Sequence, residues 1–539
     1  MPWMIPLLGA GLIWGLPRGR VALLTRRWLV MALLLGIWAS LALWRSQDAK
    51  HSALRLDAPL AAGGASLNFV LTPLGVHAGL VLTVAFTLLQ GRSLAVPLKR
   101  YEAVALLVAL GAVLAGLAAA NPLTLCLTWG LMDLGLISLA MRTMESQRRV
   151  MRFALGNLLS TLALIAAVLL ATQQDVTGLV GLAWMGAALK WLLAAALLRF
   201  GVYPLPGGFG LSWEPLLISF CMGSYLWLQL GNMPQESGIA LGGMSLLLGE
   251  SLLLTAILDA LSPVWVAARV YLLLHSATVS ASATLVAGGT GQGVVLLNTL
   301  NLALGLALIP PCDAHNPTPS TGQALLSLIP LASLAGAPLT LGFACHWTFL
   351  KLCLLQGAGI LAVMAMVSYV LLAVPLWGHA SHLLRQRQDS DADSWPQWIA
   401  FLCGLLGMTG LIAMGLAPAW LARAWLAVPM GEILPPLKTL LFAGINAQGT
   451  MVLLLVTLGI LWGSRLLMRV LTNLTPEDRR GLDLVGSLVE LDWLYVLLER
   501  WTNGLQRLLG RTLAALEGPL CITWSLLWIL SAVLLALES

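Results

Sequence analysis

Three residues within or at the ends of apolar stretches could hold or pass a proton: Asp133, Arg199 and His346. An unpaired charge at membrane depth is costly, so we expect Asp133 and Arg199 to pair with each other. The guanidinium of Arg199 keeps its proton and can only supply a counter-charge. An imidazole binds and releases protons near neutral pH, so His346 can relay one. These residue types therefore point to an ion path.

Three further residues are weaker candidates for the same path. Lys190 lies inside an apolar stretch and could line a cavity, and Lys351 follows His346. Water or His275 could bridge the middle of the path. Other polar residues that could do so are Asp259 and Glu250. Structural interpretations stay open for every candidate, because an acid can serve only in an ion pair and a long basic side chain can reach water at a helix end.

The segment Leu331–Lys351 carries a break in a hydrophobic run. Gly336, Pro338 and Gly342 interrupt it, and His346 follows the break. A broken helix at membrane depth leaves backbone N–H and C=O groups that lipid cannot satisfy, so the break must be buried in protein or lie beside water. An ionisable side chain next to such a break is a candidate for an ion path.

The composition places these residues in a membrane. Of the 539 residues, 59% are hydrophobic and 10% are charged, and the mean hydropathy is +0.90. Apolar stretches of about 20 residues, each long enough to cross a bilayer, recur along the chain; residues 67–89 and 449–467 are two of them. We therefore predict an all-α polytopic membrane protein with about 14 to 16 transmembrane helices.

The sequence lacks the motifs of the common soluble enzymes: it has no Walker loop, no GxGxxG after a strand, no HExxH and no GxSxG. Its seven cysteines form no CxxC pair and lie mostly in apolar runs, where they are expected to be small core residues. We therefore predict no metal site, no bound cofactor and no catalytic centre of the chain's own.

The net charge of +6 follows membrane topology and does not indicate a nucleic-acid partner. Alternate loops are more basic; the residues of the first, third and fifth loops are Arg18, Arg20, Arg26, Arg27, Arg92, Lys99, Arg100, Arg142, Arg148, Arg149 and Arg152. Because basic loops face the cytoplasm, the N-terminus is predicted to lie outside, in the cytoplasmic membrane of a bacterium or archaeon. The first apolar segment lacks a basic n-region and is interpreted as a retained span.

Two groups of five predicted spans each contain one helix broken by Gly and Pro, a pattern typical of inverted repeats. Further on, Thr475-Pro476-Glu477 opens an amphipathic segment, predicted to lie laterally along the membrane or partner helices, with an interfacial connector as the alternative. The predicted regions are N-terminal helices 1–101, repeats 102–231 and 232–378, C-terminal helices and loops 379–474, the lateral segment 475–518 and a final span 519–539.

Leu331–Lys351 resembles the broken twelfth helix of the antiporter-like proton-channel subunits of respiratory complex I, Mrp-type cation/proton antiporters and membrane-bound hydrogenases. The matching residues are Ser333-Leu334-Ala335-Gly336-Ala337-Pro338 and Gly342-Phe343. Ser368-Tyr369 matches a Ser before aromatic residues in the family's next helix. Leu491-Asp492-Trp493-Leu494-Tyr495 resembles a motif near the C-terminus of the Mrp and hydrogenase branch.

The chain departs from this family at its charged positions. The family has a Glu directly after a Trp in its fifth span, whereas the acid nearest to Trp129 is Asp133, about one helical turn on. Arg199 stands in the place of a seventh-span Lys, and His346 in that of a twelfth-span Lys. The family's eighth-span Lys has no counterpart in residues 213–231.

The resemblance implies an antiporter-like membrane subunit of a multi-subunit assembly that takes part in proton or sodium translocation. Its partners would be homologous antiporter-like chains, other membrane subunits and the lipid bilayer, and it would be a non-catalytic subunit of a redox-driven, NADH-quinone oxidoreductase-like translocase. The alternatives are the same fold with a degenerate channel as a structural subunit, the membrane subunit of an inorganic-carbon uptake complex, and a stand-alone secondary transporter.

Overall fold

The chain divides into two compact units, Met1–Leu474 and Thr475–Ser539. The computed structural model describes residues 2–16, 20–46, 55–59, 66–94, 98–143, 147–172, 186–202, 213–230, 241–261, 265–309, 321–386, 395–418, 447–473, 497, 500, 501, 504 and 507. In the second unit the described positions are helical and exposed. The rest of the predicted lateral segment 475–518, and the predicted final span 519–539, lie outside the described residues.

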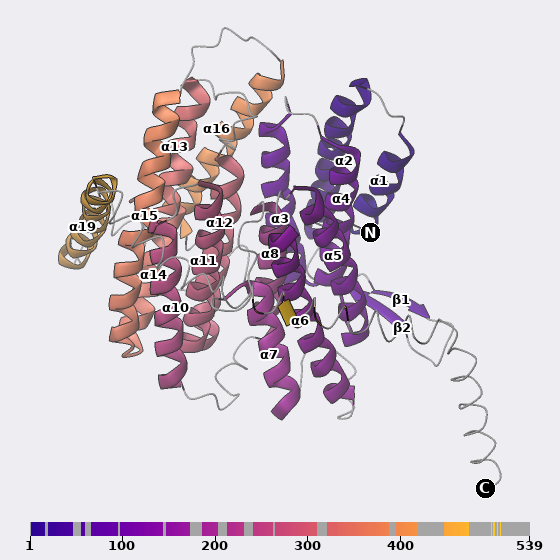
Figure 1. Cartoon of the computed structure of the whole chain (residues 1–539), viewed down its shortest axis with the longest axis horizontal. Coiled ribbons are helices and arrows are strands. Elements are labelled where there is room, and N and C mark those ends of the chain that lie inside the picture. The colour runs from indigo at the N-terminus through magenta and orange to yellow at the C-terminus, as the bar shows by residue number, and fades with distance from the viewer. Residues whose placement is uncertain are drawn as a thin grey trace, which may run out of the picture. The chain divides into compact units, whose positions relative to one another are not determined.

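Helices make up nearly all of the first unit, and most of them stand upright and side by side (Figure 1). In chain order they are α1 (Met4–Gly15), α2 (Arg20–Ser46), α3 (Pro73–Arg92), α4 (Arg100–Leu117), α5 (Pro122–Thr143), α6 (Gln147–Thr172), α7 (Gly186–Phe200), α8 (Trp213–Leu230), α10 (Leu241–Leu261), α11 (Trp265–Ala287), the 3-10 turn η1 (Gly288–Gly291), α12 (Gln292–Leu308), α13 (Thr321–Leu334), α14 (Leu341–Leu355), α15 (Gly359–Gln386), α16 (Trp395–Leu416) and α19 (Ala447–Thr472).

Within the described residues, nine helical stretches are long and apolar enough to cross a membrane. Shorter apolar helices accompany them, among them α13 and α14, which are the two halves of the predicted break. The prediction of an all-α polytopic membrane protein is confirmed. The boundaries of the two repeats and of the other regions stay predictions.

A two-stranded antiparallel hairpin interrupts the helical pattern near the N-terminus. Strand β1 (Arg55–Pro59) pairs with β2 (Ser66–Val70), so that Asp57 lies opposite Asn68. The apolar run 67–89, predicted as one span, therefore begins as a strand. The helix starts only at α3, where Thr72 caps the N-terminus by accepting a hydrogen bond from the Gly75 amide at 3.1 Å. A Pro at the first helical position also favours this start.

The predicted break between α13 and α14 is present, and protein groups satisfy its backbone. Gly336 has φ +74° and Leu339 has φ +69°, which lets the chain cross between the two half-helices. The Gly342 amide donates to Ser333 Oγ at 3.2 Å, and Ser333 Oγ donates to Asn301 Oδ1 of α12 at 2.6 Å. Protein groups thus hold the start of α14 to the end of α13, although Leu339 within the break is exposed.

Helix α7 ends at Phe200, next to a second glycine with positive φ. Gly201 has φ +88°, and its amide donates the last hydrogen bond of the helix, to Leu197 O at 3.1 Å. The close approach of α8 depends on a small residue, because a Cβ at Gly223 would lie 2.7 Å from Phe200 N. The Pro- and Gly-rich residues 203–210, predicted to bend the chain, lie outside the described residues.

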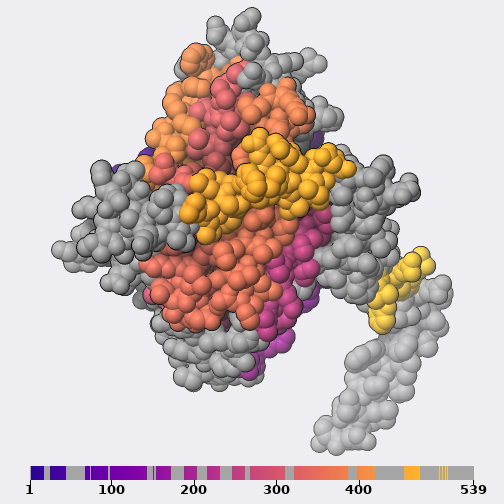
Figure 2. Space-filling view, turned by 90° about the vertical axis from the view of Figure 1, so that its left-hand side faces the viewer, coloured from indigo at the N-terminus to yellow at the C-terminus, as the bar shows by residue number. Residues whose placement is uncertain are grey.

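Helix α19 takes a different direction from the other helices. It has the length and composition of a span, but it lies across the outer face of the bundle, over α15, in Figure 2. The indole Nε1 of Trp377 on α15 donates to Ser464 Oγ on α19 at 3.1 Å. Most of α19 is exposed, including Leu455, Leu458 and Trp462, so its outer side would face lipid.

Candidate functional site

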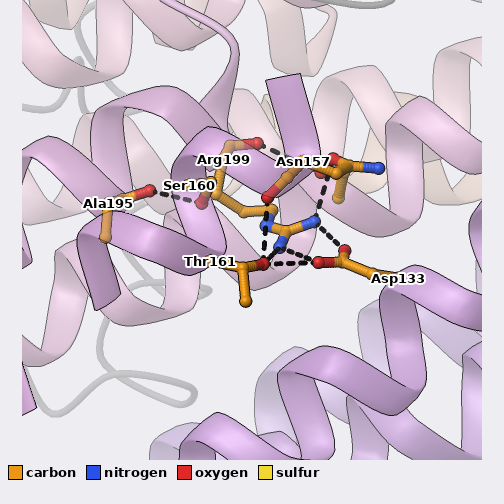
Figure 3. Close-up of polar contacts among 7 residues, drawn as sticks. Asp133, Asn157, Ser160, Thr161, Ala195 and Arg199 are labelled. Atoms are coloured by element: carbon orange, nitrogen blue, oxygen red, sulfur yellow. Dashed lines mark hydrogen bonds and ion pairs between the residues drawn. The ribbon is translucent and has the colours of Figure 1, made fainter. Parts of the chain in front are cut away.

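Asp133 and Arg199 form a buried ion pair between α5 and the C-terminal end of α7 (Figure 3). Arg199 Nη1 donates to Asp133 Oδ1 at 2.5 Å, and Nη2 donates to Oδ2 at 3.0 Å. Arg199 is only 2% exposed and Asp133 only 8%. A planar guanidinium matches a carboxylate in this two-bond arrangement, which fixes both the distance and the orientation of the pair. The expected pairing is therefore present.

Helix α6 supplies two polar residues to this pair. Arg199 Nη1 also donates to Asn157 Oδ1 at 3.0 Å, and Thr161 Oγ1 donates to Asp133 Oδ2 at 2.6 Å (Figure 3). The sequence analysis did not single out Asn157 or Thr161. The available signal was their spacing, because residues four apart share one face of a helix, and most of the residues around them are apolar.

An aromatic ring and a backbone contact complete the surroundings of Arg199. The guanidinium carbon lies 4.5 Å from the ring centre of Trp129, which is fully buried. A cation over an indole face is stabilised by the ring quadrupole. Ser219 Oγ on α8 donates to the Arg199 carbonyl at 3.3 Å. Helices from α5 to α8 thus hold this arginine in one position.

The Arg199 site retains room for water. A cavity of about 20 Å³ is lined by Asn157, Arg199 and Ser219 among others, and one water needs roughly 10–15 Å³ of such space. Among the described residues, Arg199 Nε and Asn157 Nδ2 find no hydrogen-bond partner. A water molecule in the cavity would satisfy such donors.

A second cluster holds two histidines next to the other break. The rings of His346 on α14 and Tyr369 on α15 stack, with centres 3.8 Å apart and planes at 11°. His275 on α11 meets the same Tyr369 ring edge-on at 5.8 Å. His275 Nε2 is hydrogen-bonded to Ser368 Oγ at 2.9 Å. Tyr369 therefore lies between two imidazoles from different helices.

A cavity of about 30 Å³ lies beside His346. Gly336, Trp347 and Tyr369 line it, and α19 supplies Val456, Thr457 and Ile460. Gly336 is required here, since a Cβ at this position would collide with His346 Nδ1. The break therefore makes space for the imidazole, and the volume admits a water molecule.

Apart from His275, the weaker candidates do not join these clusters. Lys190 is exposed, and Lys351 is half-buried and lines neither cavity. Glu250 is exposed. Asp259 is fully buried, and its carboxylate oxygens find no partner among the described residues. His275 is the weaker candidate that the structure brings to His346, through Tyr369.

Helix α11 separates the two clusters. Leu273 and Leu274 line the cavity beside Arg199, and the next residue along the helix, His275, belongs to the histidine cluster. Successive residues point about 100° apart around a helix of 3.6 residues per turn. One helix therefore borders the Arg199 cavity with one face and contributes His275 to the histidine cluster with another, and the side that it presents to Arg199 is apolar.

Neither a protein-family model nor a curated protein matches this sequence, whereas solved structures match its fold. A chain of the Mrp complex from Dietzia sp. DQ12-45-1b superposes with TM-score 0.73 at 15% identity, covering 99% of this chain. This chain spans 62% of the length of that Mrp chain. A chain of the membrane-bound sulfane sulfur reductase, an archaeal respiratory membrane complex, gives TM-score 0.68 at 14% identity, with 100% of this chain and 99% of the other covered.

A chain of respiratory complex I from Thermus thermophilus is a third similar structure, with TM-score 0.64 at 18% identity, covering 80% of this chain and 98% of the other. At these identities the likeness is one of fold. It confirms the resemblance in fold that Leu331–Lys351 indicated in the sequence. All three similar chains belong to membrane complexes, and the chain described here is a multi-pass membrane protein of the same fold.

Proposed function

We propose that this chain is an antiporter-like subunit of a multi-subunit membrane complex and takes part in moving protons across the membrane. The observation that carries the proposal is the placement of one ionisable cluster at the end of α7 and another at the break between α13 and α14. Asp133 and Arg199 meet where α7 ends, and His346 lies against Gly336 between α13 and α14. Broken helices with charged or titratable groups beside them are how transporters form ion sites within a bilayer.

The two clusters have different roles in this proposal. Arg199 holds a permanent positive charge, and Asp133 balances it, so the pair sets a fixed field beside α11. The histidine cluster carries the proton, because imidazole and hydroxyl groups both donate and accept. The proposed relay consists of His346, Tyr369 and His275 with Ser368. Of these, His275 and Ser368 share a hydrogen bond, whereas the rings of His346 and Tyr369 stack and the Tyr369 hydroxyl has no partner among the described residues. Water in the small cavity beside His346 would connect the remaining groups.

The ligand set favours protons over sodium. Alkali and alkaline-earth cations prefer several oxygen ligands, whereas the groups beside the break between α13 and α14 are two imidazoles and a phenol. Sodium would also require a site whose ligands replace its hydration shell. A proton needs only a chain of donors and acceptors.

The test is proton translocation by the intact complex in proteoliposomes, followed with a pH-sensitive dye. His346→Ala removes the central relay group and is expected to lower the rate about 10² to 10⁴-fold, the range over which positioned proton-transfer groups act. The matched control is His382→Ala, which removes an exposed histidine from α15 and should leave the rate unchanged. Wild-type translocation by the His346→Ala complex would refute the channel role.

A structural subunit with a degenerate channel is the second candidate. It is favoured by the apolar wall of Leu273 and Leu274 and by the small size of the two cavities, about 20 and 30 Å³. In that case His346→Ala leaves translocation intact, while loss of the whole chain prevents the complex from assembling.

We further propose that the chain lies in a bacterial or archaeal cytoplasmic membrane with its N-terminus outside, and that homologous antiporter-like chains are its partners. The full-length match to a chain of a respiratory membrane complex supports a redox-driven partner assembly. An inorganic-carbon uptake partner or a stand-alone transporter would be distinguished by what purifies with the chain.

A further inference from the structure

A groove of about 640 Å³ lies between α13, α15 and α19. Its size falls within the roughly 300–1,000 Å³ of ligand pockets. Five alanines line it, and their small side chains leave room between the helices; they are Ala332, Ala335, Ala337, Ala373 and Ala380. Helix α19 borders the groove as it lies across the bundle (Figure 2). Neither of the two ionisable clusters described above contributes an arginine or histidine to this groove.

Three arginines line the same groove. Arg385 lies in the last turn of α15, and Arg465 and Arg469 lie four residues apart on α19, on one face. All three are exposed. No Asp or Glu lines the groove in the described part of the chain. The groove therefore combines an apolar floor with a concentrated positive charge that its own lining leaves unbalanced.

The helices around the groove are joined, so its shape does not depend on a ligand. Trp377 and Ser464 lie in or next to the groove and connect α15 to α19 through the 3.1 Å hydrogen bond between indole and hydroxyl. Ser464 Oγ also donates to Leu461 O at 2.8 Å. A preformed site costs less ordering on binding than one that must be assembled.

We propose that this groove binds an anionic phospholipid. The guanidinium groups of Arg385, Arg465 and Arg469 bind its phosphate, for which arginine's planar donors are well matched. The acyl chains lie over the alanines and leucines of the floor, from which they exclude water. A zwitterionic lipid would leave the arginine charges unbalanced. Free phosphate would leave the apolar floor uncovered, so both halves of the groove favour a charged lipid.

The first experiment measures the phospholipid that stays bound when the full chain, in its complex, is purified in mild detergent. The variant Arg465→Gln/Arg469→Gln is compared with Arg500→Gln/Arg507→Gln, which removes two exposed helical arginines of the second unit. We expect bound anionic phospholipid, quantified by mass spectrometry, to fall about tenfold in the groove variant only, because charge-assisted bonds to phosphate are lost. Equal losses in both variants would show a non-specific charge effect and overturn the proposal.

The second experiment reconstitutes the purified chain in phosphatidylcholine nanodiscs doped with phosphatidylglycerol or with cardiolipin. Anionic lipid should be enriched around the wild-type chain, and excess inorganic phosphate should not displace it. Ala332→Phe keeps the arginines but fills the floor, and it should reduce this enrichment. Displacement by inorganic phosphate, or equal retention of phosphatidylcholine alone, would contradict a charged-lipid site. If Ala332→Phe does not fold, the two double arginine variants of the first experiment still test the proposal.

Discussion

Arg199 stands where the resembling family has a lysine, and its surroundings suit an arginine. Its guanidinium donates to both oxygens of Asp133 and to Asn157, and it lies over Trp129. A lysine has a single ammonium group and could not reach all of these partners at once. The residue that cannot release a proton is therefore held by several partners at once. In the function proposed above, the histidines carry the mobile proton.

Removing one partner of the Asp133–Arg199 pair should be more harmful than removing both. Asp133→Asn leaves a buried guanidinium without its counter-charge, which costs about 3–5 kcal/mol. Asp133→Asn/Arg199→Gln removes both charges, and its loss of stability should be smaller than the sum of the single losses. Thermal unfolding in detergent, followed by tryptophan fluorescence, measures this. Glu102→Gln, which breaks an exposed pair with Lys99, serves as the control, and additive losses in the cycle would argue against a coupled pair.

The half-helices α13 and α14 depend on small residues at their junction. A Cβ on Gly342 would run into the carbonyl oxygen of Ser333, so the two half-helices could not keep their present distance. We expect Gly342→Ala to destabilise the protein by about 1–3 kcal/mol, the usual cost of overpacking. Gly359, at the start of α15, has open space around it. Its change to Ala should therefore leave the melting temperature nearly unchanged, and similar melting shifts in the two variants would contradict the close junction.

The sequence predicts the break between α13 and α14 well because Gly336 and Pro338 act locally on the backbone. It also predicts the ion pair, since two opposite charges in an apolar setting have few other partners. It does not predict that Asn157 and Thr161 join the pair, because this depends on how α6 is rotated against α5 and α7. Hydropathy also does not predict the direction in which a helix runs. Residues 449–467 have the composition of a span, yet α19 lies across the bundle (Figure 2).

At the scale of the whole molecule, the same fold occurs in chains of three different membrane complexes. The match extends over 99% of the reductase chain but only 62% of the Mrp chain. We expect gentle affinity purification from its native membrane to bring along further antiporter-like chains and small hydrophobic subunits. Mass spectrometry of the purified material checks this, and recovery of the chain by itself would favour a stand-alone transporter.

Helix α19 has a consequence for how the protein is made. Val456, Thr457 and Ile460 form one wall of the cavity at His346, yet they leave the ribosome about a hundred residues after that histidine. Because chains emerge N-terminus first, the bundle up to α16 can be inserted while His346 still has an open side. The cavity beside His346 can therefore close only late in synthesis, once α19 has been made and lies over α15. Until then, a nascent chain has the histidine cluster but not the closed cavity beside it.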